Sequence, residues 1–408
     1  DRVFLERYVG RGRHVEVQVF GDGQGRVMHL GERDCSIQRR YQKIVEEAPA
    51  PNLSDALCRR LHQSAVALAK AAGYVGPGTV EFVVEGDDCF FLEMNTRLQV
   101  EHPVTEMVAG LDLAKLQLQV AFGGSLPPQP ALRGHSIEAR VYAEDPDGGF
   151  LPASGVIRRL RLPEGAGIRN EVGVQVGDEI GVRYDPLLAK LIVWGSDRKE
   201  ALVRLQEALR HYCLLGVTTN LPFLLRLARD ADFAEANFTT QFLSEHALPS
   251  EPSEDLEIAA SAWQAVRRSP DPFRHGWRGS EDAHILPDGS LALDGRVYDV
   301  VEDEQNIEVW HDGRRGVFAK AQPPSLEAAA LGHSSADGTR SLTAPMPGVV
   351  SKVLVKEGDD VIEHQTLVVL EAMKMEHNVQ SASAGVVRRV RFRKGDLVPA
   401  GAVLVEIE

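Results

Sequence analysis

The sequence has few cysteines, no long apolar run and a shortage of positive charge, and each of these excludes a class of protein. Only four of its 408 residues are cysteines, and no two form a C-x-x-C pair. This argues against a disulfide framework or a zinc knuckle and suits a reducing compartment. No apolar run reaches the roughly 18 residues that a membrane-spanning helix needs. Lys and Arg number 45 against 59 Asp and Glu, a net charge of −14, so we expect neither a nucleic-acid nor a membrane partner.

Changes of pattern along the chain divide it into four regions. Strand-like and helical runs alternate over residues 1–245, which predicts an α+β domain with its own core. Short alternating strands after a helix expected near 254–267 predict a small β-rich docking region over 246–320. Residues 321–341 are rich in Ala, Ser, Gly and Pro and are expected to form a flexible linker. Residues 342–408 form the last unit.

One helix of the first region shows clear start and stop signals. It is expected to open at Ser54, a residue type that caps helix N-termini, and to end at Gly73. Its periodicity predicts an apolar face. The residues of that face are Leu57, Leu61, Ala65 and Leu68.

The last unit contains an internal repeat. Gly348-Val349-Val350 returns as Gly385-Val386-Val387, a spacing of 385 − 348 = 37 residues, and later matches keep that spacing. Two copies this short cannot each bury a sheet face, so they are expected to pair into one β sandwich with quasi-twofold symmetry. The connection between the copies would be exposed, with Lys374 at its centre between Met373 and Met375.

This segment resembles a known domain family. Ala344-Pro345-Met346-Pro347-Gly348 and Glu371-Ala372-Met373-Lys374-Met375 are similar to the motifs of biotinyl (biotin carboxyl carrier) domains. The resemblance implies covalent biotin on Lys374, attached by a biotin protein ligase. Lipoyl domains share the fold but usually flank their lysine with Asp and Ala, so the methionines favour biotin over the lipoyl alternative.

Two strands near residue 90 carry a row of polar side chains. Thr79–Glu85 and Phe90–Asn95 read as strands joined by a loop. Alternation places a set of residues on one side as long as the backbone stays extended, with Glu81 facing them. That set is Glu93, Asn95, Arg97, Gln99 and Glu101. Carboxylate and amide oxygens suit Mg²⁺ or Mn²⁺ bound with nucleotide phosphates, and Arg97 can clamp an oxyanion.

The first region also resembles a known family, the ATP-grasp subunit biotin carboxylase, from residue 1 to about 245. The motifs that carry the resemblance are Glu6-Arg7-Tyr8, Arg13-His14-Val15-Glu16, Glu32-Arg33-Asp34-Cys35-Ser36, Gln38-Arg39-Arg40, Gln42-Lys43, Glu46-Glu47-Ala48-Pro49, Glu93-Met94-Asn95-Thr96-Arg97 and Gln99-Val100-Glu101-His102-Pro103-Val104-Thr105-Glu106. Together with the biotinyl motifs, they resemble the α subunit of acyl-CoA carboxylases, the 3-methylcrotonyl- and geranyl-CoA type in particular. The implied fold class is α+β: the C-terminal part of an ATP-grasp biotin carboxylase, a small all-β middle unit and a biotinyl/lipoyl-type β sandwich.

The resemblance implies a role for each matching residue. Glu81, Glu93 and Asn95 would hold the metal ions. Lys43, Arg97, Gln99 and Val100, the last through its backbone, would cradle bicarbonate. Glu101 resembles the general base, and Arg140 the arginine that stabilises the enolate of biotin. Glu6, His14, Gln38 and Tyr41 match nucleotide-contacting positions, although Tyr41 stands where many relatives carry His and Arg7 where Lys is usual.

The implied activity is carboxylation of the chain's own biotin, driven by ATP and bicarbonate. The carboxyl group would pass to a carboxyltransferase β subunit in a hetero-oligomer, and the acyl-CoA pocket would lie on that partner. The family's N-terminal subdomain and glycine-rich lid are missing here, so an inactive biotin-carrier fragment is an alternative. A carboxylase of the propionyl-CoA, acetyl-CoA or pyruvate type would carry similar motifs and is a third interpretation. The bacterial cytoplasm is the expected location, with the mitochondrial matrix also open.

Overall fold

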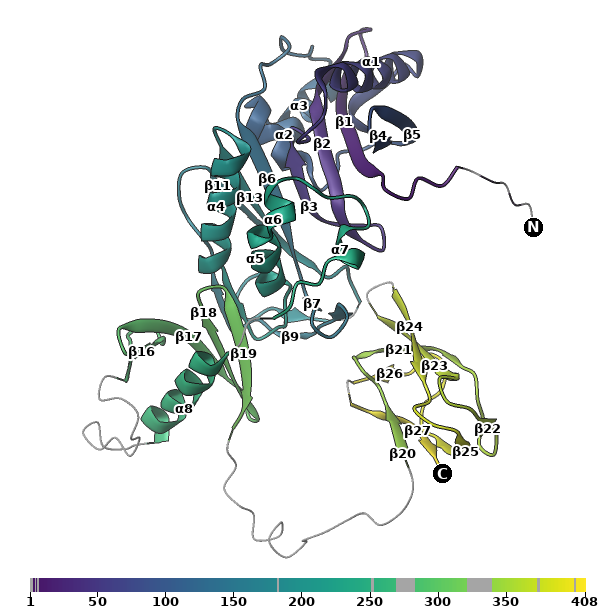
Figure 1. The fold of residues 1–408 in the computed structure, drawn as a ribbon, viewed down its shortest axis with the longest axis vertical. Coiled ribbons are helices and arrows are strands. Elements are labelled where there is room, and N and C mark those ends of the chain that lie inside the picture. Colours follow the sequence, from purple (N-terminus) through teal and green to yellow (C-terminus); the bar gives the residue numbers. More distant parts are fainter. Residues whose placement is uncertain are drawn as a thin grey trace, which may run out of the picture.

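The computed structural model forms three parts joined along the chain (Figure 1). It describes residues 3, 5, 7–181, 183–250, 253–268, 283–320, 340–372, 375–399 and 401–408. We call 7–250 the N-terminal part, 253–320 the middle unit and 340–408 the C-terminal unit. Most of the expected linker lies outside the described residues, as do Glu6 and Lys374. Within the described ranges, no helix is long and apolar enough to cross a membrane.

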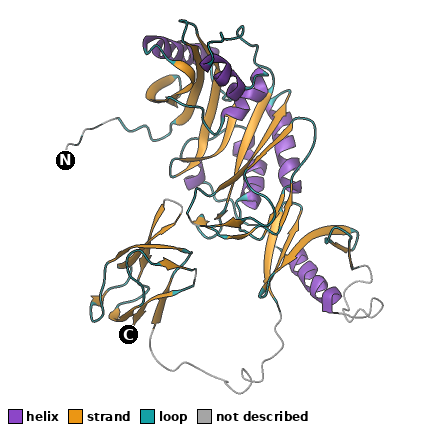
Figure 2. Cartoon of the chain, turned by 180° about the vertical axis from the view of Figure 1, so that it is seen from behind, coloured by secondary structure: helices purple, strands orange, loops and turns teal. Residues whose placement is uncertain are grey.

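A fully antiparallel eight-stranded sheet organises the N-terminal part (Figure 2). Its spatial order is β11 (Ile168–Val172), β13 (Leu187–Gly195), β6 (His135–Tyr142), β3 (Gln42–Ala48), β2 (Val27–Arg39), β1 (Arg13–Asp22), β4 (Val75–Glu85) and β5 (Asp88–Asn95). Short strands border it: β7 (Glu144–Asp145), β8 (Leu151–Pro152), β9 (Gly155–Val156), β10 (Arg159–Arg161), β12 (Glu179–Ile180) and β14 (Cys213–Leu215). Most side chains of β1, β2 and β6 are buried, so both faces of the sheet are covered there.

Helices cover both faces because alternate side chains of each strand point to opposite sides. The helices are α1 (Asp55–Ala71), α2 (His102–Ala109), α3 (Leu113–Ala121), α4 (Arg198–His211), α5 (Leu221–Arg229), α6 (Ala231–Ala234) and α7 (Phe242–Glu245). On β6 and β13, odd-numbered residues such as Ala139 and Leu191 join the core that contains α4 and α5. Ile192 points the other way, into a cluster with Val104 and Val108 of α2. The even-numbered face of these strands therefore belongs to α2.

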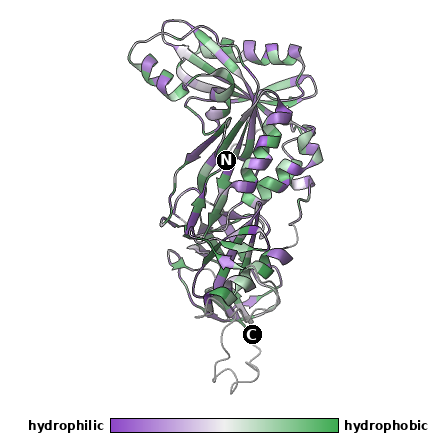
Figure 3. Ribbon diagram, turned by 90° about the vertical axis from the view of Figure 1, so that its left-hand side faces the viewer, coloured by the Kyte–Doolittle hydropathy of each residue, from purple (hydrophilic) through white to green (hydrophobic). Residues whose placement is uncertain are grey.

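Helix α1 begins as expected, but its buried face differs at one position. The Ser54 side chain accepts a hydrogen bond from the backbone N–H of Leu57, and Gly73 follows the C-cap with φ +58°. The buried positions are Leu57, Leu61, Ala65 and Ala69. The prediction for Leu68 was wrong, since it is 37% exposed. Successive steps of four residues keep the buried side chains of α1 on the face that packs against the sheet, whereas a step of three turns Leu68 toward solvent. Figure 3 shows hydrophilic and hydrophobic residues mixed along the helices.

The middle unit packs one helix on a five-stranded antiparallel sheet. Its elements are α8 (Glu254–Arg268), β15 (His284–Ile285), β16 (Leu291–Leu293), β17 (Arg296–Glu302), β18 (Asn306–His311) and β19 (Arg314–Ala319). Leu256 and Trp263 of α8 share a core with Val300 and Val309. The next residue, Trp310, points to the opposite side and is buried in the core of the N-terminal part, which ties the two parts together.

The C-terminal unit is the expected quasi-symmetric β sandwich. Its strands are β20 (Arg340–Thr343), β21 (Gly348–Val353), β22 (Asp360–Val361), β23 (Thr366–Ala372), β24 (Met375–Gln380), β25 (Gly385–Val390), β26 (Leu397–Val398) and β27 (Val403–Ile407). One sheet has the order β20-β27-β25-β22 and the other β24-β23-β21-β26. The repeat relates β21 to β25, β22 to β26 and β23 to β27. Each sheet therefore takes strands from both copies, and neither copy could fold on its own.

Candidate active site

A row of charged side chains crosses four neighbouring strands. Glu16 on β1 lies opposite Glu81 on β4 on one side and opposite Arg33 on β2 on the other. Glu93 on β5 lies opposite Glu81 in turn. Directly paired residues point to the same face of a sheet, so three acids stand side by side with one guanidinium. Such a row is stable only if further cations compensate it.

Lys43 provides the central compensating charge. Its Nζ donates to Oε2 of Glu16 at 2.7 Å, to Oε1 of Glu81 at 3.2 Å and to Oε1 of Glu101 at 2.5 Å. Burial disfavours the ammonium, yet the charges of the surrounding acids outweigh that effect and raise the pKa of Lys43. Lys43 is therefore a fixed positive charge among three carboxylates.

Arg33 anchors the inner end of the row and is fully buried. Its Nε donates to Oε1 of Glu16 at 2.5 Å, and its Nη2 donates to Oε1 of Gln99 at 2.7 Å. Further bonds reach Gln18, Thr79 and Thr105. Burial alone would raise the pKa of Glu16, but the charges of Arg33 and Lys43 outweigh it and hold that pKa at about 2. Glu16 is therefore ionised throughout the neutral range.

Glu101 joins this row to a second arginine. It forms the N-cap position of α2, and its Oε2 accepts a hydrogen bond from Nη2 of Arg140 at 3.0 Å. The same Nη2 contacts Oε1 of Glu46. Lys190 donates from Nζ to the backbone carbonyl of Val100 at 2.7 Å. Lys43 and Arg140 thus each contact one oxygen of the Glu101 carboxylate, at the N-terminus of α2.

The predicted metal ligands lie together on β4 and β5. Nδ2 of Asn95 donates to Oε1 of Glu81 at 2.9 Å and to Oε1 of Glu93 at 3.2 Å, and Gln99 also donates to Oε1 of Glu81 at 2.8 Å. Burial alone would raise the pKa of Glu81, but a hydrogen bond from His14 and the charge of Lys43 hold it at about 2. Two carboxyl groups joined by an amide form a hard-oxygen donor set, which fits Mg²⁺ or Mn²⁺. Possible ligand atoms of His14, Glu16 and Glu81 form a second group, in which all of them lie within 4.8 Å of one another.

The extended alternation expected beyond Asn95 does not continue. β5 ends at Asn95, and a turn at residues 100–101 leads directly into α2. Gln99 and Glu101 reach the site from this irregular segment. Arg97 remains exposed and, among the described residues, donates only to the carbonyl of Leu98 at 3.4 Å. Gln99 and Glu101 thus join the row through a bend where an extended strand was expected, whereas Arg97, expected on the same side, contacts none of these acids in the part of the chain that the structure describes.

The residues proposed to contact the nucleotide differ in their contacts and in their exposure to solvent. His14 contacts Oε2 of Glu81 through Nε2 at 2.9 Å and Nε2 of Gln38 through Nδ1 at 3.3 Å. Tyr41 is 97% exposed, at the turn between β2 and β3 with φ +65°. Arg7 lies over the ring of Phe90. Glu6 lies outside the described residues.

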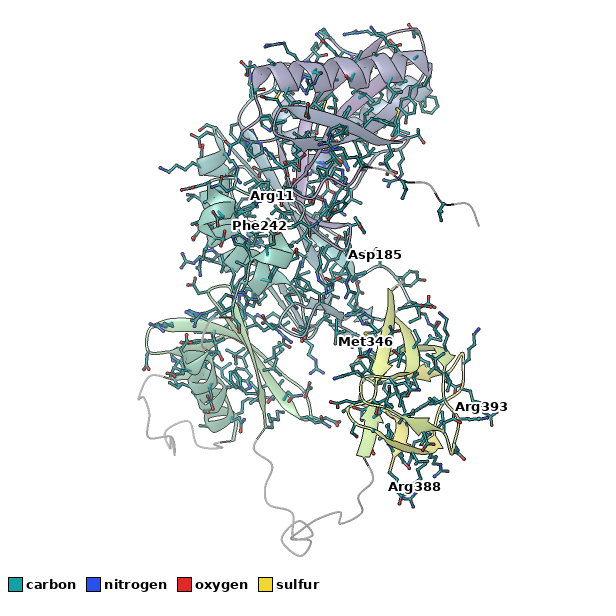
Figure 4. All side chains as sticks on the ribbon, turned by 45° about the vertical axis from the view of Figure 1, so that its right-hand side comes forward. Arg11, Asp185, Phe242, Met346, Arg388 and Arg393 are labelled. Carbon is teal, nitrogen blue, oxygen red and sulfur yellow. The ribbon has the colours of Figure 1, made fainter. Side chains whose placement is uncertain are left out.

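The predicted site residues that the structure describes in the N-terminal part all border one cavity of about 1390 Å³. Its wall includes Glu81, Glu93, Asn95, Arg97, Gln99, Val100, Glu101, Arg140, Lys43, His14, Gln38 and Tyr41. Asp185, also in its wall, lies on the side of the N-terminal part that faces the C-terminal unit (Figure 4). The volume exceeds that of an ordinary drug-sized pocket of roughly 300–1,000 Å³, so it has room for more than one small reactant.

Sequence reasoning missed several charged residues of this site. Glu16, Arg33 and Glu46 lie within the motifs of the resemblance, and Glu138 lies in the matching segment around Arg140, yet no pattern in the sequence gives them a role. Lys190 lies outside all of these motifs. An acid at an internal position of a strand, such as Glu16 among Val15, Val17 and Val19, is a usable signal, because acids are rarely buried without a partner.

Comparison with known protein families accounts for most of the chain. The family described as "Carbamoyl-phosphate synthase L chain, ATP binding domain" matches residues 1–129, and "Biotin carboxylase C-terminal domain" matches residues 138–245. The family described as "Biotin-requiring enzyme" matches residues 340–407.

Solved structures of similar proteins share the N-terminal part. The biotin carboxylase domain of Hydrogenobacter thermophilus 2-oxoglutarate carboxylase, solved with MgADP, ADP and bicarbonate, is 46% identical with a TM-score of 0.58, covering 59% of this chain and 54% of that one. The biotin carboxylase subunit of pyruvate carboxylase is 42% identical with a TM-score of 0.59, covering 60% and 56%. Together with the family matches, these neighbours confirm the biotin carboxylase and biotinyl parts of the predicted fold class. The middle unit is not all-β as predicted, because α8 packs its apolar side chains into the core of that unit.

Curated relatives extend along the whole chain. The mitochondrial methylcrotonoyl-CoA carboxylase subunit alpha of Rattus norvegicus is 39% identical over 100% of this chain and 66% of its own length, and that of Arabidopsis thaliana 35% identical over 100% and 68%. The propionyl-CoA carboxylase alpha chain of Ruegeria pomeroyi is 36% identical over 100% and 72%. The chain thus spans about two thirds of the length of such relatives. It belongs to the family of biotin-dependent acyl-CoA carboxylase α subunits, with biotin carboxylase and biotin-carrier parts.

Proposed function

We propose that this chain carboxylates biotin carried on its own Lys374, using ATP and bicarbonate. The observation that carries the proposal is the meeting of Lys43, Glu101 and Arg140 at one wall of the cavity, with Glu81, Glu93 and Asn95 beside them. This arrangement offers a base, two fixed cations and a hard-oxygen donor set within one enclosure. Those are the groups that joining a bicarbonate anion to a weak nitrogen nucleophile requires.

Glu101 is proposed as the general base toward bicarbonate. A carboxylate can deprotonate a bound reactant when it lies within hydrogen-bond reach of it. Lys43 and Arg140 hold Glu101 on both oxygens, and the same cations would attract the bicarbonate anion. Arg97, which is exposed in the cavity wall, and the amide of Gln99 would complete the anion cradle, together with the backbone at Val100.

Glu81, Glu93 and Asn95 are proposed to hold Mg²⁺ or Mn²⁺. When bound, the metal would neutralise phosphate oxygens, which phosphoryl transfer needs more than covalent help. The chain's own contribution is to keep the acids ionised and in place: Lys43, Asn95 and Gln99 all donate to Oε1 of Glu81. His14, Gln38, Tyr41 and Glu6 are the proposed nucleotide contacts.

Arg140 is proposed to stabilise negative charge on biotin. The ureido nitrogen becomes nucleophilic as charge develops on the ureido oxygen, and a fixed guanidinium stabilises that charge most when it is already oriented. Arg140 is 8% exposed and borders the cavity. Its orientation is set by Glu46 and Glu101 together.

The C-terminal unit is the proposed biotin carrier, with a biotin protein ligase attaching biotin to Lys374. Leu151 of the N-terminal part packs against the apolar core of the C-terminal unit. Burial and the charges of Arg40 and Arg39, which border the cavity, lower the pKa of His377 on β24. These contacts support delivery of biotin to this cavity. The chain between the units, residues 321–339, is at most roughly 65 Å when fully extended, so the carrier could also visit a second site.

That second site is proposed to lie on a carboxyltransferase β subunit, which would carboxylate an acyl-CoA in a hetero-oligomer. The relatives act in methylcrotonoyl- and propionyl-CoA carboxylases, and which acyl group this assembly takes would be decided by the partner's pocket. Some relatives are mitochondrial and one is bacterial; we place this chain in the bacterial cytoplasm as part of the proposal.

The test is ATP cleavage that depends on both bicarbonate and biotin, measured on the protein at its natural full length. Glu101→Gln is expected to lower turnover by roughly 10²-fold or more, because a positioned base contributes 10²–10⁴-fold. Arg97→Ala is expected to lower turnover by roughly 10²-fold or more as well, because the anion cradle would lose its guanidinium. Glu207→Gln, an exposed acid on α4, is the matched control. Wild-type rates in both site variants would contradict the proposal.

A second candidate is a carrier without catalysis, in which the chain only presents biotin to partners. Capture by avidin together with no bicarbonate-dependent ATP cleavage would favour that candidate. Intact mass separates biotin from lipoate on Lys374, because the two groups add different masses.

A further inference from the structure

Two acids are buried side by side behind the catalytic arginine. Glu46 on β3 lies directly opposite Glu138 on β6, and both side chains are fully buried. Opposed residues share a face of the sheet, and here that face is covered by α2. Two carboxylates in such a position cannot both be ionised at low cost.

The cations around this pair contact Glu46 or groups outside the pair, and none of them contacts Glu138 in the described part of the chain. Nη2 of Arg140 contacts Glu46 and Glu101. Nζ of Lys190 contacts Oε2 of Glu171 at 2.5 Å and the carbonyl of Val100. Among the residues that the structure describes, neither oxygen of Glu138 has a hydrogen-bond partner. Glu138 is thus a buried acid that no cation neutralises.

Ionising a carboxylate in this position would remove its charge from water without an ion-pair partner, which is strongly unfavourable. Burial, and next the charge of Glu46, raise the pKa of Glu138 well above its ordinary value, while Lys190 and Arg140 oppose this and Glu101 adds to it. Burial raises the pKa of Glu46 as well, and the charge of Arg140 reduces this rise without cancelling it, whereas Glu138 has no such contact among the described residues. The proton of the pair therefore stays on Glu138, and the charge on Glu46.

We propose that Glu138 is a positioning residue for Arg140, held as a neutral carboxylic acid so that its neighbour Glu46 alone carries charge toward the guanidinium. A second negative charge at Glu138 would draw Arg140 toward the sheet and away from Glu101. A protonated Glu138 can instead donate to Glu46, and this leaves Arg140 shared between Glu46 and the cavity. The inference rests on the proposed function only for the role of Arg140 in stabilising negative charge on biotin.

The neutral form can be tested without turnover. The infrared difference spectrum between wild type and Glu138→Gln should contain the carbonyl band of a protonated carboxylic acid. This band should persist from about pH 6 to about pH 9, because burial keeps Glu138 protonated over that range. Glu47→Gln is the matched control. Glu47 follows Glu46 on β3, but it is paired with His135 and Arg198, so its variant should lose no such band. Absence of the band in the wild-type spectrum would overturn the proposal.

The positioning role is tested by kinetics. Glu138→Gln keeps a neutral hydrogen-bond donor and should restore most of the biotin-carboxylation rate that Glu138→Ala loses, a loss of roughly tenfold to a hundredfold. Glu46→Gln should lose at least as much as Glu138→Ala in kcat, with the KM for ATP unchanged in both variants. Equal losses in Glu138→Gln and Glu46→Gln would show that Glu138 is needed as an anion and would refute the proposal. If wild type itself shows no biotin carboxylation, the proposed function fails, and the infrared band still decides the state of Glu138.

Discussion

The ion pair between Glu16 and Arg33 allows the stability of the sheet to be predicted quantitatively. Glu16→Gln keeps the shape of the side chain and removes its charge, leaving Arg33 fully buried without its anion. The pKa of Glu16 falls from 4.5 to about 2 on folding. A difference of about 2.5 units at 1.36 kcal/mol each corresponds to roughly 3 kcal/mol of stability at pH 7. Breaking a buried pair by removing one partner costs a similar 3–5 kcal/mol.

The sign of the pH dependence follows from the direction of the shift. Because folding lowers the pKa of Glu16, its contribution is complete above pH 4.5 and is lost as the pH falls toward 2. The gap between wild type and Glu16→Gln should therefore be widest at neutral pH and shrink below pH 4.5.

Amide hydrogen exchange in peptides of β1 and β2 is the suitable assay, because a chain with several domains does not unfold in one two-state step. Glu85→Gln, which removes a half-exposed acid from the end of β4, is the control and should change exchange little. The assigned charge compensation would be wrong if the amide exchange rates of Glu16→Gln equalled those of this control at pH 7. It would also be wrong if the difference in exchange between wild type and Glu16→Gln failed to narrow below pH 4.5.

Two further predictions concern packing. Leu61→Ala should destabilise the N-terminal part by about 2–5 kcal/mol, because Leu61 is fully buried, whereas Leu68→Ala should cost under about 1 kcal/mol. Equal changes in the amide hydrogen exchange of peptides from α1 would contradict the assigned helix face. Gly134→Ala should cost at least about 1–3 kcal/mol, because Gly134 has φ +70° and an added Cβ would lie 2.2 Å from the carbonyl oxygen of Gly195. Unchanged amide hydrogen exchange in peptides of β6 and β13 in Gly134→Ala would show that the backbone can adjust there.

Local patterns were sufficient for much of the fold. Ser54 and Gly73 mark the ends of α1 because capping depends on a few neighbouring residues. The 37-residue repeat predicted the paired architecture of the C-terminal unit, since two equivalent short copies have to share a core. Leu68 was assigned to the wrong face because the boundary of a helical stripe depends on what packs against it.

The candidate site was predictable only as far as its motifs extend. Glu81, Glu93 and Asn95 were grouped correctly in space, because strand alternation is a local property. The bend after Asn95 was not foreseen. It depends on α2 docking against the sheet, which involves residues far apart in the sequence.

By itself, the sequence determined which chemical groups are present: the lysine between two methionines, the acids and amide of the strand pair, and the motifs that identify the family. Only the tertiary structure decided their charge states and partners. Glu16 meets Arg33 and Glu81, and Glu46 meets Glu138, through strand pairings that no local pattern encodes. The energy of a buried charge depends on the cations within a few ångströms of it. An acid in a motif therefore becomes an anion or a neutral donor only once the fold has set its neighbours.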